Sequence, residues 1–296
     1  MSKPKLKVSF SGGRSSAYMA AMIKQNWSDV YEIVFVFCNT SQEDDRTLVF
    51  VNEVDKYFDL GVVWLEAVIN EGMGNATTHR VVNFETAKRN GEVYLEMVKK
   101  YGVPNKIFQP CNRELKLRPM DSYMRSIGWE DYATAIGIRC DESRRVSEKA
   151  EKLNILYPLV DSFPVDKQDV LSYWEAQSFD LGIDEHEGNC LWCFKKSDKK
   201  LFQLISERPE IFDFPALLDD EYGFHGAPYY GSAPDGAIPR VPFRGALSTK
   251  QLFTKAAIAG VVPGSKRRII PIGVDDRDTG SCSESCEAYE TGESEV

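Results

Sequence analysis

Short apolar runs alternate with amphipathic helical segments through the first two thirds of the chain. Residues 32–38 (EIVFVFC) are almost wholly apolar, as expected of a strand that is covered on both faces of a parallel sheet. Strands that alternate with helices predict an α/β protein with an open, mainly parallel twisted sheet and helices on both faces. The expected strands are 6–10, 32–38, 61–69, 132–138 and 155–160, and the expected helices are 16–25, 46–58, 92–101, 116–127, 166–179, 201–211 and 214–222.

The composition divides the 296 residues into three parts. We expect an α/β domain over 1–200, a helical and irregular region over 201–274, and an acidic flexible tail over 275–296. The tail holds eight acids and one arginine, so it carries −7 of the net charge of −9 and lacks the apolar residues of a core. The nearly neutral remainder does not exclude a nucleic-acid partner.

No apolar run approaches the ~20 residues that span a bilayer. The first residues lead into a short strand and lack the apolar core of a signal peptide. We therefore expect a cytoplasmic protein that has no contact with membranes. In this reducing compartment the odd count of seven cysteines argues against a disulfide framework.

The first expected strand runs directly into residues 11–16 (SGGRSS), and a helix follows. Glycines let a backbone approach phosphate oxygens closely, and a helix N-terminus offers unpaired N–H groups and a positive dipole end. The three serines of this loop add hydroxyl donors. The order of strand, loop and helix therefore predicts a phosphate cradle, while an ordinary glycine turn with a serine N-cap remains the alternative. Neither the Walker A pattern nor G-x-G-x-x-G is present.

Polar residues follow three of the expected strands. Ser11, Asn39 and Arg139 each come just after a strand. Because ligands of open α/β sheets bind beyond the carboxyl ends of the strands, these residues are expected to meet at one edge of the sheet.

The segment SFSGGRSSAYMA resembles the PP-loop (SGG-x-[DST]-S) of the adenine nucleotide alpha-hydrolase-like superfamily. Five more segments resemble, in order, its phosphoadenosine phosphosulfate (PAPS) reductase-like family: VFCNTSQEDDRTLVFV, FQPCNRELKLRPM, AIGIRCDESRRV, YPLVDSFPVDKQDV and GNCLWCFKKS. Together they cover about residues 7–212. The chain is most similar to uncharacterised members from bacteria and their phages, which would place it in a host cytoplasm if it is phage-encoded.

The resemblance implies a site for ATP or PAPS, with Mg²⁺ beside the phosphates. It implies that Lys116 and Arg139 act in catalysis. Lys116, Arg118, Arg139, Arg144 and Arg145 are candidates to pair with phosphate or sulfate, and local pairs on a solvated helix face are the alternative for all but Arg139. The nucleotide-binding residues that it implies are Ser11, Gly12, Gly13, Arg14, Ser15, Ser16, Asn39, Thr40 and Gly137.

Two positions depart from the family pattern. Ser15 stands where the PP-loop usually carries an aspartate, which bears on how the triphosphate and its magnesium are held. The reductases also end in a Cys-Gly-Leu/Ile-His tail whose cysteine attacks the sulfonate. This chain has Cys282 and Cys286 in its last residues, and no such tail.

Cys190 and Cys193 form a C-x-x-C pair, which suits a redox dithiol, a zinc half-site or an iron–sulfur half-site. By resemblance, Cys111 joins them in a [4Fe–4S] centre with one iron open to sulfide, and Cys140 is the candidate fourth ligand. A Zn²⁺ site completed by His186 is the rival. Cys140 is as readily a small buried apolar residue, which is also our expectation for Cys38.

Three functions remain open at this point. The first is ATP-dependent adenylylation, with release of AMP and pyrophosphate and sulfur transfer to an unknown nucleic acid or small molecule. The second is PAPS or APS reduction with a thioredoxin-like reductant. The third is non-catalytic nucleotide binding, which Ser15 keeps open. The lysine pairs at 195–196 and 199–200 fit a nucleic-acid backbone or a plain solvated surface, and homo-oligomerisation stays undecided.

Overall fold

The structure, a computed structural model, describes residues 2–72, 74–106, 108–188, 190–223, 243–244 and 247–268. The expected acidic tail and nearly all of the Gly-, Pro- and Tyr-rich segment 227–243 lie outside these ranges. The proposed domain boundaries after residues 200 and 274 therefore stay predictions.

Six strands form one sheet in the order β4-β3-β2-β1-β5-β6. Strand β4 runs antiparallel to β3, and all the other neighbours are parallel. The predicted α/β class with a mainly parallel sheet is confirmed. The strands are β1 (Lys5–Ser9), β2 (Glu32–Cys38), β3 (Val63–Val68), β4 (Thr78–Val82), β5 (Ala133–Ala135) and β6 (Ile155–Leu156).

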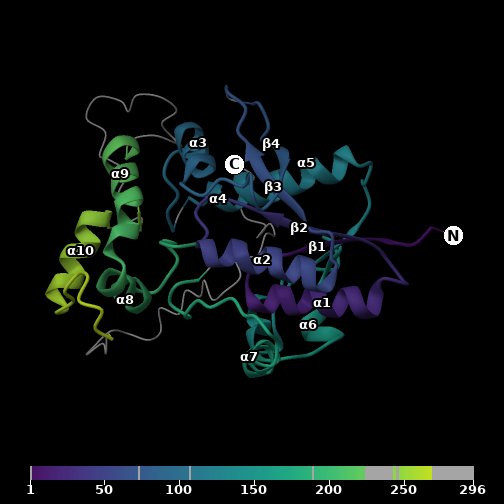
Figure 1. Cartoon of the computed structure of the whole chain (residues 1–296). Helices are drawn as coiled ribbons and strands as arrows, with labels where there is room; N and C mark the ends of the chain where they lie inside the picture. Colours follow the sequence, from purple (N-terminus) through teal and green to yellow (C-terminus); the bar gives the residue numbers. More distant parts are fainter. Residues whose placement is uncertain are drawn as a thin grey trace.

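Helices cover both faces of the sheet (Figure 1). One face lies under α1 (Arg14–Trp27), α2 (Asp45–Phe58), α6 (Pro158–Asp161) and α7 (Lys167–Glu175). The other lies under α3 (Glu92–Tyr101), α4 (Pro110–Asn112) and α5 (Arg118–Ser126), with a π-helix, η1 (Arg113–Leu117), between the last two. A 3₁₀ helix, η2 (Cys140–Arg145), follows β5. The chain then continues through α8 (Asp198–Glu207), a 3₁₀ helix η3 (Pro209–Phe212), α9 (Asp213–Tyr222) and α10 (Thr249–Ile258).

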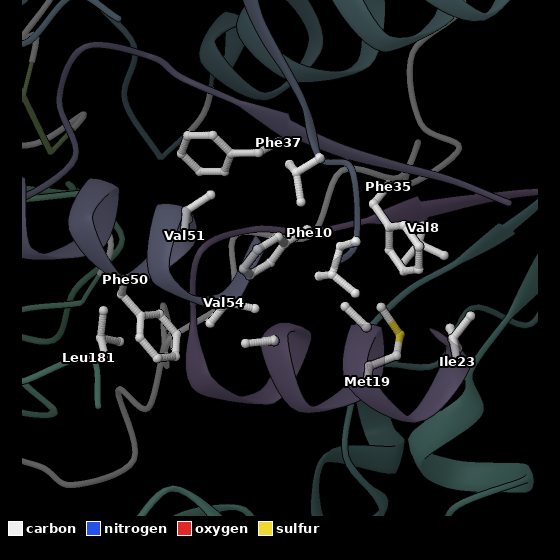
Figure 2. Packing of buried hydrophobic residues seen from close by; sticks show 14 of the residues in the cluster. Val8, Phe10, Met19, Ile23, Phe35, Phe37, Phe50, Val51, Val54 and Leu181 are labelled. Atoms are coloured by element: carbon white, nitrogen blue, oxygen red, sulfur yellow. The ribbon is translucent and has the colours of Figure 1, made fainter. Parts of the chain in front are cut away.

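Alternation along β2 divides the core between the two faces, because successive side chains of a strand point to opposite sides. Phe35 and Phe37 join the cluster under α1 and α2, where Figure 2 shows them near Phe10. Val36 and Cys38 join a second cluster beneath α5. The expectation that Cys38 is a small buried residue is confirmed.

A further cluster joins the sheet to the C-terminal helices. Ala67 of β3 and Met97 of α3 pack in one cluster with Trp192, Leu201 of α8 and Leu252 of α10. The change in sequence pattern after Cys193 therefore does not mark a break in the hydrophobic core.

Most expected helices agree with the structure to within a few residues, and Asp166 caps α7 as expected. The strand expected over 155–160 is wrong beyond Leu156, because Pro158 begins α6 instead. The helix expected over 116–127 is preceded and partly replaced by the π-helix η1. Strand β4 was not expected, because its Thr-His-Arg start at a sheet edge carries no apolar signal. Helix α10 was not expected either.

The part of the chain that the structure describes contains no helix with both the length and the apolarity needed to cross a bilayer.

Replacing Phe37 with alanine should lower the free energy of unfolding by about 3–5 kcal/mol, the usual cost of emptying a buried aromatic site. Phe37 is buried and packs edge-on against Phe10 and Trp64. Urea denaturation measures the loss. Val30→Ala, at a residue that is 52% exposed, serves as the control and should stay within about 0.5 kcal/mol of wild type. Equal losses in the two variants would contradict the core described above.

Candidate nucleotide site at the carboxyl edge of the sheet

The loop between β1 and α1 is shaped by close packing. Gly12 has a φ of +84°, and a Cβ there would lie 2.7 Å from Cγ2 of Thr47, so only glycine fits. The Ser16 hydroxyl donates to the Gly13 carbonyl at 3.0 Å and accepts from the Ser11 N–H at 3.2 Å. Ser16 therefore holds the loop in shape.

The N-terminus of α1 has no side-chain cap among the described residues. Gly13 is its N-cap, and its first turn holds no acidic residue. The positive end of the helix dipole and the N–H groups of the first turn therefore face the loop without a side-chain anion of this helix. This is the arrangement that binds phosphate in other α/β proteins.

Gly137 forms the second wall of the loop. It follows β5, which pairs with β1, and a Cβ on it would lie 3.0 Å from Cα and 3.2 Å from N of Ser16. The structure thus brings Gly137 to the loop, as the sequence predicts, with a close approach of two backbones as its evident role.

Arg139 also reaches the loop. This nearly buried arginine donates through Nη1 to the Ser15 hydroxyl at 3.0 Å. Its Nε and Nη2 donate to the two carboxylate oxygens of Asp141 at 2.9 and 3.1 Å, and Glu142 lies 3.4 Å away. The guanidinium is therefore already paired, and it fixes the serine that stands in the usual aspartate position.

Arg14 is also paired with a carboxylate. It donates to both oxygens of Asp180 at 2.7 and 2.5 Å and to the Ile183 carbonyl at 3.2 Å. Burial acts to raise the pKa of Asp180, but the hydrogen bonds from Arg14 outweigh it and lower the pKa. The Arg14 carbonyl accepts from the indole of Trp174 at 3.0 Å. Arg14 thus anchors the loop to the chain before the C-x-x-C turn.

Asn39 is held by a buried carboxylate. Its Nδ2 donates to Glu66 at 2.7 Å and to the Lys88 carbonyl at 2.8 Å, while its Oδ1 accepts from the Ser41 N–H at 3.2 Å. Glu66 is fully buried and also accepts from Arg80 at 2.8 Å. Asn39 thus lies at the predicted edge, where its hydrogen bonds shape the backbone.

Thr40 binds Glu43, a buried residue that the sequence did not single out. The carboxylate of Glu43 accepts from the Thr40 N–H at 2.9 Å and its hydroxyl at 2.7 Å. Burial raises the pKa of Glu43, while the charge of Lys116 and the hydrogen bonds from Thr40 act against it. Lys116 is therefore close enough to this edge for its charge to act on the Glu43 carboxylate.

Lys116 lies in the π-helix η1, a rare element that occurs often at functional sites. Its carbonyl accepts from the thiol of Cys38 at 3.6 Å. Burial raises the pKa of Cys38 to about 12, although the charges of Lys116 and Lys7 act to lower it. Cys38 is therefore unsuited to thiolate chemistry, whereas Lys116 is half-buried at the edge that holds Thr40 and Glu43.

Four charged residues tie the edge to later parts of the chain. Arg208 donates to Asp44 at 2.7 Å and to Glu187 at 3.2 Å, and Arg46 pairs with the same two carboxylates. Burial acts to raise the pKa of Asp44, but hydrogen bonds from the two arginines hold it well below its ordinary value. This network joins the start of α2 to the end of α8.

The predicted metal ligands are only partly brought together. Cys111 packs against the cluster that contains Trp192 and Phe194, which flank Cys193, so these cysteines lie in one region. Cys140 starts η2, and its N–H donates to the Val165 carbonyl. Within the described ranges, no three His, Cys, Asp or Glu side chains are placed to hold a metal ion. The metal assignment therefore stays a prediction.

His186, the rival zinc ligand, lies 2.6 Å through Nε2 from a carboxylate oxygen of Glu207. A zinc ion at His186 would therefore have to bind through Nδ1, because Nε2 faces a carboxylate.

The C-x-x-C turn docks on the loop that follows β2. Cys190 forms a β-bridge with Glu43, and the Leu191 N–H donates to the Gln42 carbonyl at 3.1 Å. The indole of Trp192 donates to Gln42 Oε1 at 2.6 Å. The sequence separates these segments by about 150 residues, and the structure brings them together at the predicted edge.

Comparison with known proteins finds a relative that matches nearly the whole chain. It is 32% identical over 290 residues to an uncharacterised nin region protein, ORF290, of Escherichia phage lambda, and the match covers 95% of this chain and 94% of that protein. The chain belongs to the ORF290 family. This agrees with the expected likeness to uncharacterised phage proteins, while the reductase-like assignment remains a proposal. No family model matches.

Two more distant likenesses cover parts of the chain. It is 22% identical to the uncharacterised protein MJ0066 of Methanocaldococcus jannaschii over 174 residues, which make up 58% of this chain and 31% of that protein. Among solved structures it is similar to a PAPS reductase from Candida auris in complex with phosphate, with a TM-score of 0.35 and 16% identity over 58% of this chain and 72% of that one. That TM-score is too low for the likeness to bear on the function of this chain.

Sequence reasoning missed the carboxylates of the site. Glu66 lies two residues before the end of its strand, and an acid inside an apolar run (VWLEAV) is a signal of a buried, paired charge. Glu43 and Asp180 carry no comparable pattern, because their partners lie in segments that only the fold brings near.

Asp44→Asn should destabilise the protein near neutral pH and make its stability less sensitive to acid. The folded-state pKa of Asp44 lies below the ordinary value of about 3.9, so the stabilisation is fully present above about pH 5 and is lost as the pH falls through the folded pKa. The difference between the urea midpoints of wild type and variant should therefore narrow as the pH is lowered from 7 to 3.

Asp29→Asn provides the control, because it removes an equal charge from an exposed position. A wild-type to Asp44→Asn difference that stays constant down to pH 3 would show that the carboxylate charge is not what stabilises this network.

Proposed function

We propose that residues 11–16 bind the phosphates of an adenine nucleotide and that the chain is a PP-loop enzyme of the PAPS reductase-like type. The observation that carries this proposal is the uncapped N-terminus of α1 beneath a glycine loop, which is packed tightly between Thr47 and Gly137. The loop lies at the carboxyl end of β1, between two parallel neighbours, where ligands of open α/β sheets bind.

Backbone N–H groups are the main phosphate donors in this proposal. Arg14 and Arg139 have carboxylate partners, so they hold the loop rigid and contribute little net positive charge. The first turn of α1 supplies N–H groups that need no reorganisation when an anion arrives. Ser11 and Ser15 add hydroxyl oxygens at the loop, and Mg²⁺ remains an expectation of the resemblance.

We propose adenylylation as the reaction. A carbonyl oxygen of the acceptor attacks the α-phosphorus of ATP, the bond to the β-phosphate breaks, and pyrophosphate leaves with the electron pair. The outer sulfur of a cysteine persulfide, supplied by a persulfide sulfur donor, then displaces AMP and links the activated carbon to the cysteine through an S–S bond. A reducing thiol attacks the cysteine sulfur, the S–S bond breaks, and the thiolated acceptor leaves with the electron pair. A second thiol then reduces the resulting mixed disulfide and restores the cysteine. Lys116 is the cation that we assign to the developing negative charge, because its charge reaches the same edge of the sheet.

None of these proposed steps uses a metal centre. The sequence favours a [4Fe–4S] site at Cys111, Cys190 and Cys193, yet the described side chains do not gather three ligands. The sulfur is therefore assigned to the C-x-x-C pair itself, and iron and zinc assays of the anaerobically purified protein remain the direct test of the metal prediction.

PAPS reduction is the second candidate. It is favoured by the place of Cys190, a half-buried residue whose backbone pairs with Glu43 at the same edge of the sheet. A thiolate there would attack the sulfonate sulfur, adenosine 3′,5′-bisphosphate would leave, and a cysteine S-sulfonate would form. A thioredoxin-like dithiol would then attack the cysteine sulfur, release sulfite and regenerate the thiol.

Gly12→Ala should weaken ATP binding by more than about tenfold in calorimetry, because the added methyl group must push the loop away from Thr47. Gly61→Ala is a matched control, since Gly61 also has a positive φ, of +68°, but its Cβ would meet nothing within 4 Å. The two variants share the backbone strain, and only Gly12→Ala disturbs the loop. A folded Gly12→Ala protein with wild-type affinity would refute the phosphate site.

Labelled ATP should yield AMP and pyrophosphate when the anaerobic protein is given a persulfide sulfur donor and an acceptor, tested with bulk tRNA and with duplex DNA. A parallel incubation contains PAPS and reduced thioredoxin. Sulfite from PAPS without AMP formation would put the reductase first. Nucleotide binding with neither product under any of these conditions would favour the non-catalytic alternative.

A further inference from the structure

A buried ammonium group organises the C-x-x-C turn. Lys196 is only 1% exposed, and its Nζ donates to the Cys190 carbonyl at 2.6 Å, to the Leu191 carbonyl at 3.3 Å and to the Glu187 carbonyl. An ammonium group has three donors, so these three carbonyls satisfy all of them. The sequence places this lysine in a run of basic residues that resembled a solvated surface, and the structure corrects that reading for Lys196.

The carbonyl oxygens are the main compensation for this charge. Among the residues that the structure describes, Lys196 has hydrogen bonds to carbonyls only and no carboxylate at ion-pair distance. Taking a cation out of water costs several kcal/mol unless polar groups replace its hydration shell. The carbonyls of Glu187, Cys190 and Leu191 are therefore constrained to point at Nζ, which limits the conformations open to the turn.

Arg244 holds the other end of the same turn. It is buried, and its Nη1 donates to the Phe194 carbonyl at 2.9 Å and to the Lys196 carbonyl, while its Nη2 donates to Asp198 at 2.8 Å. Arg244 comes from a segment about 50 residues away. Two buried cations thus fix the backbone on both sides of Cys193.

The two cysteines occupy different environments as a result. Cys193 is 7% exposed and lies between Trp192 and Phe194 of the buried cluster. Cys190 is half-buried, and its backbone pairs with Glu43 at the edge that holds the proposed nucleotide loop. The turn therefore presents one cysteine and hides the other.

We propose that Lys196 is a positioning residue of the C-x-x-C turn, which presents Cys190 at the candidate site and keeps Cys193 buried. The contact that carries the proposal is the set of three carbonyl-to-ammonium hydrogen bonds. Its use in catalysis rests on the proposed function, because sulfur transfer and PAPS reduction both need one accessible thiol at this edge.

Alkylation of the native chain tests the proposal. The protein as purified is treated briefly with iodoacetamide, and peptide mass spectrometry gives the modification rate of each cysteine. In wild type, Cys190 should react at least about tenfold faster than Cys193, because a buried group reacts only when the structure opens locally. Equal rates in the native wild-type protein overturn the proposal without the need of any variant.

Lys196→Met keeps the length of the side chain and removes its donors, so the ratio of the two rates should fall by about tenfold as Cys193 becomes reachable. Lys196→Arg, which keeps the charge and can donate to carbonyls, should restore part of the ratio. Leu201→Ala is the matched control, because it empties a buried site of the same cluster and lowers stability without touching the ammonium. A ratio that falls equally in Leu201→Ala, or stays at the wild-type value in Lys196→Met, refutes the positioning role.

Calorimetry with ATP on the same proteins separates this inference from the proposed function. Lys196→Met should bind ATP with wild-type affinity, since Lys196 does not contact residues 11–16. Failure of wild type to bind ATP, with the alkylation ratio as expected, would remove the nucleotide site and leave the positioning role standing. If Lys196→Met does not fold, the ratio of the two alkylation rates is measured in Lys196→Gln and compared with the wild-type ratio.

Discussion

The tight packing at two glycines around the loop after β1 is the constraint on which the rest of the site depends. Gly12 must accept Thr47 of α2 against its Cα, and Gly137 must lie against Ser16. Neither position has room for a side chain. The loop is consequently held between α2 and the chain after β5, and the N-terminus of α1 is directed at one place beyond the carboxyl ends of the strands.

Paired buried charges make this edge rigid before any ligand arrives. Arg14 is bound by Asp180, Arg139 by Asp141, and Asn39 by Glu66. Burying a charge is costly unless it is paired, so each of these partners limits where its segment can lie. In the proposed nucleotide site, such an edge would bind the phosphates through backbone donors, because carboxylates of the protein already neutralise the side-chain cations.

Sequence patterns predicted the parts of the fold that rest on local periodicity. The apolar run at β2 and the glycine loop were both identifiable, since each signal lies within a few residues. The pairings were not, because Asp180 and the C-x-x-C turn meet their partners only through the tertiary fold. Strand β4 and the burial of Lys196 were missed for a related reason, since polar residues at an edge or in a turn resemble solvated surface until their partners are known.

The C-terminal helices bear on the site through shared packing. Trp192 donates to Gln42 at the edge of the sheet and also packs in the cluster of α8 and α10. Arg208, at the end of α8, binds Asp44 at the start of α2. The C-x-x-C turn is thus fixed from two directions, by the loop after β2 and by the helical region. Because Cys190 pairs with the loop after β2 and the neighbours of Cys193 pack against α8 and α10, the helical region forms part of the framework of the candidate site.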